Sequence, residues 1–290
     1  MSKLRYTQFY LSVCIIALLA TLANLNMNSD TLIIVLALGV TFLGLPHGAL
    51  DFALAKSLKL VTSVSSAIRF VAIYISIAAI SISFWTWTPD IALILFLGVS
   101  VFHFSADWRT SMPLFARLSM ACALLCGPSI LYATTLTELF TALLLTNDAA
   151  NWVIQGMQIT FYVGMSGFLY FLYQLFLSKK IPNVWQSTEW LTLLLSSIVL
   201  SPLLHFGLYF CLLHSPKHLQ DVGVKLHVSI KAAITISLPF VIFTTVLAAV
   251  LYQFYGNSDL NVDLLRWIFI GLFGLTMSHV WLIHLWHRSD

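Results

Sequence analysis

The chain has 290 residues, of which 60% are hydrophobic and 9% are charged, and its formal net charge is +3. A soluble domain has fewer apolar and more charged residues, so we expect a lipid bilayer to be the solvent. The basic residues stand in small clusters beside apolar runs and form no stripe that could follow a phosphate backbone, which argues against nucleic acid as a partner. Cys14, Cys122, Cys126 and Cys211 lie inside apolar runs without zinc-site or disulfide spacing, and we interpret them as packing residues.

Apolar runs long enough to cross a bilayer recur along the chain, since a transmembrane helix needs about 20 such residues. The first run follows Lys3 and Arg5 like a signal peptide, but another hydrophobic run comes directly after it, so we favour an uncleaved first helix. We predict an all-α fold, a polytopic transmembrane helical bundle of about eight spans, with residues 1–290 as a single integral membrane domain. The candidate stretches are 8–24, 31–54, 68–87, 90–108, 114–134, 152–177, 188–213, 231–254 and 264–286.

Two stretches leave the topology open. Residues 135–146 are apolar but too short to cross alone, so they either extend the fifth helix or form a re-entrant element. Lys and Arg occur in alternate loops as far as Lys180, which predicts a cytoplasmic N-terminus. If 188–213 crosses once, Lys217 and the lysines after it fall outside; either that helix breaks near Ser201–Pro202 and continues towards residue 228, or the span count is wrong by one.

Nine histidines in so apolar a chain indicate a functional interior, because polar side chains are costly in hydrocarbon. Three pairs of polar residues share a spacing of four, which places both members on one face of a helix. Neutral imidazole is a good ligand for a transition metal, so three such pairs on distant helices predict a buried metal site. The pairs are His47 with Asp51, His103 with Asp107, and His214 with His218.

The second ring nitrogen of a metal-binding histidine normally needs an acceptor such as a carboxylate. Asp51 and Asp107 are suited to that role. Spacing alone leaves open whether each carboxylate serves the histidine one turn before it or a partner on a neighbouring helix.

The remaining histidines lack such pairs. We interpret His205 and His227 as structural residues that form ordinary hydrogen bonds. His279, His284 and His287 cluster at the end of the last run, where an interfacial position would cost little. Their role is undecided, and His279, the deepest of them, is the best candidate either for a further ligand or for a residue that supports a ligand.

Aromatic residues flank the histidine motifs. They could line a channel for a rigid apolar substrate, although core packing explains most of them more simply. These residues are Phe102, Phe104, Trp108, Tyr209 and Phe210.

The motifs resemble those of the Brp/Blh-type bacterial and archaeal β-carotene 15,15′-dioxygenases. The resemblance rests on Gly44-Leu-Pro-His-Gly-Ala-Leu-Asp51, on Val101-Phe-His-Phe104 with Asp107, on Leu213-His-Ser-Pro-Lys-His218 and, less closely, on Ser278-His-Val280. These segments extend from the second predicted helix to the last, so the resemblance covers most of the chain.

The resemblance implies an Fe(II)-dependent membrane dioxygenase, an oxidoreductase that uses O2 to split β-carotene at its central 15,15′ double bond into two molecules of all-trans-retinal. Such a protein would be a multi-pass component of the bacterial inner membrane, and its retinal could be delivered to a rhodopsin. The implied residues are His47, His103, His214 and His218 as iron ligands, and Asp51 and Asp107 as supporting acidic residues.

Two other interpretations remain open from the residues alone. A histidine-box desaturase or hydroxylase with two irons would need about eight clustered histidines, whereas only His214 and His218 form such a box here. A non-catalytic haem-bearing or metal-transporting bundle would also place histidines on facing helices. Spacing by itself does not distinguish iron from zinc or copper.

Overall fold

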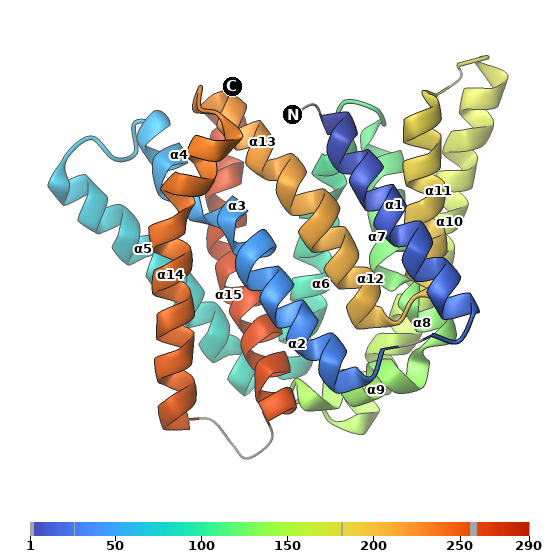
Figure 1. Cartoon of the computed structure of the whole chain (residues 1–290), viewed down its shortest axis with the longest axis horizontal. Helices are drawn as coiled ribbons and strands as arrows, with labels where there is room; N and C mark the ends of the chain where they lie inside the picture. Colours follow the sequence, from blue (N-terminus) through green and yellow to red (C-terminus); the bar gives the residue numbers. More distant parts are fainter. Residues whose placement is uncertain (1–2, 26, 181, 256–259, 290) are drawn as a thin grey trace.

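The computed structural model describes residues 3–25, 27–180, 182–255 and 260–289, and these residues form helices and connecting loops without a strand (Figure 1). The first helix, α1 (Lys3–Leu22), packs against α11 and buries Tyr10 and Cys14 completely. Thr7 of α1 also donates a hydrogen bond to Glu189 at 2.6 Å. The first hydrophobic run is therefore an integral part of the bundle. Both ends of the chain lie at the same end of the molecule.

The predicted span 31–54 is not one regular helix. It is divided into α2 (Ser29–Gly39), the π-helix η1 (Val40–Gly44), α3 (Leu45–Ala49) and α4 (Asp51–Ser57). Pro46 has no N–H and its ring crowds the carbonyl four residues earlier, so the hydrogen-bond ladder widens just before it. Gly44 allows a close approach here, because a Cβ atom at this position would lie 2.7 Å from Cε1 of Phe210.

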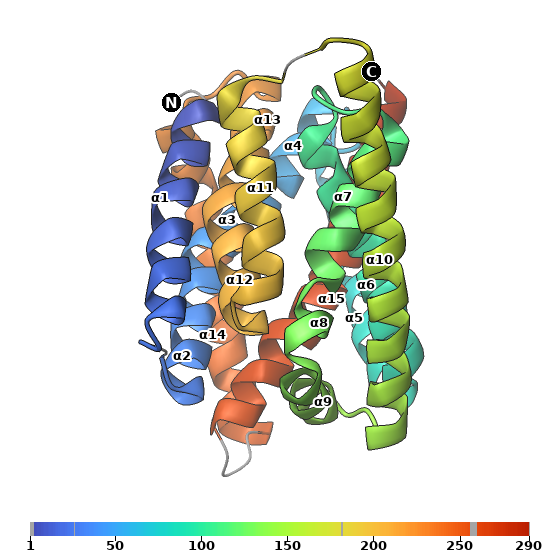
Figure 2. The same cartoon turned by 90° about the vertical axis from the view of Figure 1, so that its right-hand side faces the viewer.

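The next four predicted spans correspond to long helices, and one additional short helix lies between the third and the fourth of them. They are α5 (Val64–Trp87), α6 (Pro89–Ser105) continued by the 3₁₀ turn η2 (Ala106–Trp108), α7 (Leu114–Cys126) followed by α8 (Pro128–Leu131), and α10 (Asn147–Leu177). The uncertain stretch 135–146 contains a separate short helix, α9 (Ala133–Ala142), rather than an extension of the fifth span. Figure 2 shows α9 at the end of the bundle opposite the two termini.

The prediction of a single span over 188–213 is wrong. Helix α11 (Val184–Val199) ends where Leu200 and Ser201 become extended, and α12 (Pro202–Leu208) begins with Pro202, which cannot donate an N–H to the preceding turn. The π-helix η3 (Tyr209–His214) and α13 (Ser215–Lys225) then return the chain to the end that holds the termini (Figure 1). The first of the two topological alternatives is therefore confirmed.

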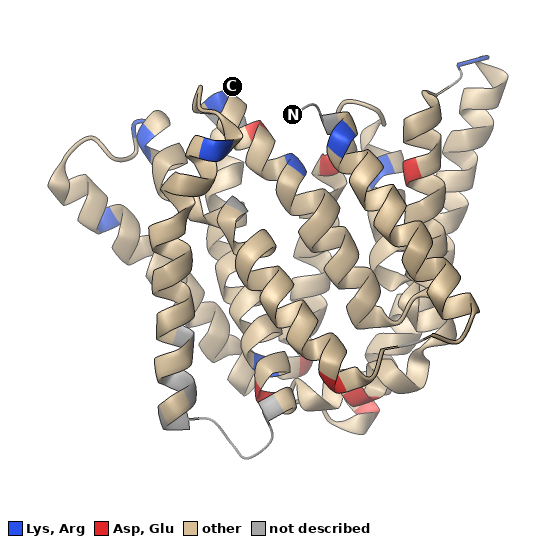
Figure 3. Cartoon of the chain, in the orientation of Figure 1, with Lys and Arg blue, Asp and Glu red and all other residues tan. Residues whose placement is uncertain are grey.

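Two further long helices, α14 (Ile230–Tyr255) and α15 (Leu260–Ser289), complete the bundle. Most Lys and Arg residues gather at the end that holds the termini (Figure 3). Within the described residues, seven helices are long and apolar enough to cross a membrane, against about eight predicted. Of the nine candidate stretches, 31–54 and 188–213 have no such helix because their helices are broken. The seven are Leu4–Leu22, Val64–Trp87, Pro89–Trp108, Leu114–Leu131, Asn147–Leu177, Ile230–Leu247 and Asn261–Trp286.

Candidate functional site

Four histidine rings from distant segments meet inside the bundle, and we call them the histidine cluster. They belong to His103 near the end of α6, His214 at the end of η3, His218 on α13 and His279 on α15. The ring centroids lie 4.8 Å apart for His103 and His214, 4.9 Å for His218 and His279, and 5.2 Å for His103 and His279. The structure thus brings together three of the predicted ligands and adds His279, whose role the sequence left undecided.

The shortest contact in the cluster joins the Nε2 atoms of His103 and His214, which are 3.0 Å apart. A hydrogen bond accounts for this distance if one ring carries the Nε2 proton. The same distance also suits two ligands of one metal ion, since nitrogens about 2.1 Å from an ion and at right angles lie about 3.0 Å from each other.

Asp107 holds His214 in a fixed orientation. Nδ1 of His214 lies 3.0 Å from one carboxylate oxygen of Asp107, and the hydroxyl of Tyr209 donates to the other oxygen at 2.7 Å. In a neutral imidazole whose Nδ1 donates to a carboxylate, the lone pair is on Nε2. This is the atom of His214 that faces His103.

Asp51 performs the same task for His279. Nδ1 of His279 lies 2.9 Å from each oxygen of Asp51, and the hydroxyl of Tyr74 donates to Oδ2 at 2.7 Å. Both carboxylates therefore hold a histidine from a distant helix. Spacing left open whether each carboxylate serves the histidine one turn before it or a partner on a neighbouring helix, and in both cases the partner is on another helix.

His47 is the one predicted ligand whose side chain the structure does not describe. Its backbone lies in α3, which packs against α13 beside the segment that carries His218, but its side chain lies outside the described part of the structure. The side chain of His287 is also outside that part. The prediction that His47 joins the other ligands stays a prediction.

The cluster can be compared with what a metal ion requires. Among the described side chains, no group of three or more His, Cys, Asp or Glu residues has the arrangement of a metal site. The donor set nevertheless fits a transition metal in kind, because buried imidazoles with carboxylates on Nδ1 are the usual ligands, and one pair of Nε2 atoms is at a suitable distance.

The remaining histidines lie outside the cluster. His205 is buried, with Nδ1 3.2 Å from Oγ of Ser196 and Nε2 3.2 Å from the carbonyl oxygen of Leu124, as expected of a structural histidine. His227 is exposed and has a φ of 55° in the turn that ends α13. His284 is exposed on α15.

A buried ion pair, which the sequence reading missed, lies beside the cluster. Nζ of Lys217 is 2.7 Å from Oε1 of Glu189, and Glu189 also accepts hydrogen bonds from Thr7 and from the indole of Trp108 at 3.2 Å. The pair connects α1, η2, α11 and α13, and Lys217 directly precedes His218 in α13. The signal in the sequence is an acidic residue within the predicted stretch 188–213, Glu189, followed by Lys217 just beyond the end of that stretch.

The fold and the site together define a multi-pass membrane protein with a buried histidine–carboxylate cluster. A sequence model of the β-carotene 15,15′-dioxygenase family matches residues 38–287, a range that contains every residue of the cluster. The β-carotene 15,15′-dioxygenase of uncultured marine bacterium 66A03 is 30% identical over 260 residues, which cover 84% of this chain and 90% of the relative. The chain therefore belongs to the β-carotene 15,15′-dioxygenase family, as its motifs implied. No solved structure matches the chain.

Proposed function

We propose that the protein is an Fe(II)-dependent membrane dioxygenase that cleaves β-carotene at the central 15,15′ double bond and forms two molecules of all-trans-retinal. Membership of the family supports this assignment, and the observation that carries it within the chain is the histidine cluster with its two carboxylates. The reaction balances without a further reductant, since one O2 supplies one oxygen atom to each aldehyde.

The proposed iron ligands are His47, His103, His214 and His218, with Asp51 and Asp107 as the acidic residues that support the site. Bound iron would supply a place where dioxygen is activated. Asp107 accepts a hydrogen bond from Nδ1–H of His214 and so keeps the Nε2 lone pair directed at His103.

The aromatic rings around the cluster exclude water and favour an apolar substrate. The ring of Phe104 lies 4.7 Å from that of His214, and Phe210 stacks on His214 with an interplanar angle of 20°. A carotenoid is apolar and dissolves in the bilayer, so it would reach the site from the lipid. The rings then hold the polyene beside the histidines by dispersion contacts.

The proposed location is the bacterial inner membrane with the N-terminus in the cytoplasm. The concentration of Lys and Arg at the end that holds both termini supports this orientation, because cytoplasmic loops carry an excess of these residues (Figure 3). Retinal released there would be available to a rhodopsin in the same membrane. The family match argues against the histidine-box desaturase and the haem-bearing bundle.

The proposal is tested by expressing the chain in a bacterium that produces β-carotene and measuring carotene and retinal. We expect loss of the orange colour and formation of about two retinal molecules per carotene consumed. His214→Ala should abolish the reaction, whereas His227→Ala, at an exposed position, should leave it unchanged. Unchanged carotene in the presence of folded, iron-loaded protein would refute the assignment.

A further inference from the structure

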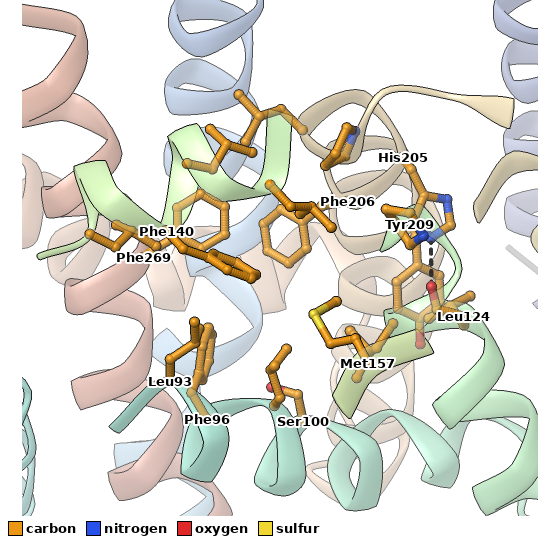
Figure 4. A pocket seen from close by; sticks show the side chains of 18 of the residues that line it. Leu93, Phe96, Ser100, Leu124, Phe140, Met157, His205, Phe206, Tyr209 and Phe269 are labelled. Atoms are coloured by element: carbon orange, nitrogen blue, oxygen red, sulfur yellow. Dashed lines mark hydrogen bonds between the residues drawn. The ribbon is translucent and has the colours of Figure 1, made fainter. Parts of the chain in front are cut away.

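An apolar pocket adjoins the histidine cluster on one side. Its cavity volume is about 100 Å³, and its lining is almost entirely apolar. Figure 4 shows its wall, which includes Phe96 and Ser100 from α6, Phe140 from α9 and Phe269 from α15. The polar atoms of His205 and Tyr209 at the wall are already engaged with other protein groups. The space therefore suits a ligand without polar groups.

Two side chains belong both to the pocket and to the surroundings of the cluster. The ring of Phe104 lines the pocket and lies 4.7 Å from the ring of His214. The ring of Tyr209 lines the pocket while its hydroxyl donates to Asp107. The pocket therefore begins at side chains that also contact His214 and Asp107. Of the five aromatic residues named as channel candidates, Phe104 and Tyr209 line this space. Phe102 is 67% exposed and lies outside it.

The pocket has the length of half a carotenoid. Its lining residues on α6 run from Leu93 to Phe104 along one face of the helix, a rise of about 16 Å. A carotenoid is about as long as the hydrocarbon core is thick, about 30 Å, so each half measures about 15 Å. With the central bond beside the histidines, one half would extend as far as Leu93.

The end of the pocket remote from the cluster is held firmly. Phe140 and Leu143 line it, and the segment that carries them is fixed by two side chains from other helices. The indole of Trp85 donates to the carbonyl oxygen of Leu143 at 3.0 Å, and Nε of Arg266 donates to that of Ala142 at 2.8 Å. A terminal ring that reaches this end would meet a fixed wall.

We infer that this pocket binds one half of the polyene, with the terminal ring near Phe140, and that its length determines which double bond lies at the histidines. The inference rests on the proposed function and adds a binding site and a basis for central cleavage. A terminal ring seated against the fixed wall leaves the bond about 15 Å away beside the cluster, which for a symmetrical carotenoid is the middle of the molecule.

The test narrows the pocket halfway along α6. Leu97→Trp adds bulk to a lining residue, about 10 Å from Phe104 along the helix, and Leu95→Trp makes the same change at a position that is 40% exposed on that helix and outside the pocket. Cleavage of β-carotene is compared with cleavage of β-apo-8′-carotenal, whose shortened half lacks the terminal ring and needs only the part of the pocket nearest the cluster. We expect Leu97→Trp to lower kcat/KM for β-carotene relative to that for the apocarotenal at least tenfold, and Leu95→Trp to change the ratio less than twofold.

Carotenoid binding is measured in parallel, so that the pocket is tested independently of catalysis. Protein stripped of iron by a chelator is purified from carotene-producing cells, and the carotenoid retained per protein is determined from its absorbance. Leu97→Trp should retain at least tenfold less than Leu95→Trp. Equal retention and an unchanged substrate ratio in folded Leu97→Trp protein would overturn the pocket assignment while wild-type cleavage still stood. Wild-type protein that binds carotene in a Leu97-dependent manner but does not cleave it would support the pocket and refute the proposed function.

Discussion

Each of the two buried carboxylates accepts a tyrosine hydroxyl as well as a histidine nitrogen. Tyr209 and His214 share Asp107, and Tyr74 and His279 share Asp51, with oxygen–oxygen distances of 2.7 Å in both cases. A buried carboxylate needs several donors to remain charged, and each tyrosine supplies one. The tyrosines therefore stabilise the charged carboxylates that orient the two histidines.

Removal of the Tyr209 hydroxyl should weaken metal binding without changing the shape of the site. Tyr209→Phe keeps the ring in the pocket wall but leaves Asp107 without one of its donors. Loss of such an outer hydrogen bond typically lowers metal affinity about 10–100-fold. Competition between the protein and an iron chelator measures the change. Tyr173→Phe, at an exposed position on α10, is the control, and equal iron affinity in both variants would contradict the role given to Tyr209.

His279 should behave as a member of the metal site rather than as an interfacial residue. His279→Gln removes the ring held by Asp51 and should reduce iron retention at least tenfold, because the cluster loses one of its four described imidazoles. Iron per protein after gel filtration gives the measurement. His284→Gln makes the same change at an exposed position of the same helix and should retain iron fully. A variant of His279 with wild-type iron content would place this residue outside the site.

At the scale of the elements, both π-helices stand directly before a proline. η1 ends at Gly44, two residues before Pro46, and η3 ends at His214, two residues before Pro216. Each proline removes one backbone donor and displaces the carbonyl four residues earlier, so the preceding turn widens. The widened turns lie beside each other, since η1 contacts η3. The first ends three residues before His47, and the second ends at His214.

The close approach of these two segments predicts a cost for any side chain at Gly44. A Cβ atom there would lie 2.7 Å from Phe210, the ring that stacks on His214. We expect Gly44→Ala to destabilise the protein by about 1–3 kcal/mol through overpacking. The measurements are the thermal unfolding midpoint in detergent, which should fall by several degrees, and carotene cleavage, which should decrease. Gly98→Ala, where a Cβ meets nothing within 4 Å, should be neutral or slightly stabilising; an equal response at both glycines would show that packing against Phe210 is unimportant.

At the scale of the whole molecule, the sequence patterns predicted the positions of the helices better than the contacts between distant helices. Apolar runs located the long helices because hydrocarbon demands uninterrupted apolar surface. The Lys distribution left a break near Ser201–Pro202 as one of two alternatives, and the structure shows that break. Spacing identified three of the four histidines that meet and left His279 undecided. It could not show that Asp51 reaches His279, because this contact joins residues 228 positions apart. The pairing of Glu189 with Lys217 was missed for the same reason.

Removing one charge of the Lys217–Glu189 pair should destabilise the protein far more than removing both charges together. Lys217→Met leaves the Glu189 carboxylate buried without its cation, and breaking a buried pair costs about 3–5 kcal/mol. Glu189→Leu leaves the Lys217 ammonium buried without its anion and also deprives Trp108 and Thr7 of an acceptor. The double variant removes both charges, so its unfolding midpoint should lie well above that predicted by adding the two single effects. Strict additivity would show that the two charges do not interact. If the double variant recovers both stability and iron binding, the ion pair serves only to join α11 and α13. Two apolar side chains of similar size can then fill the same space between these helices.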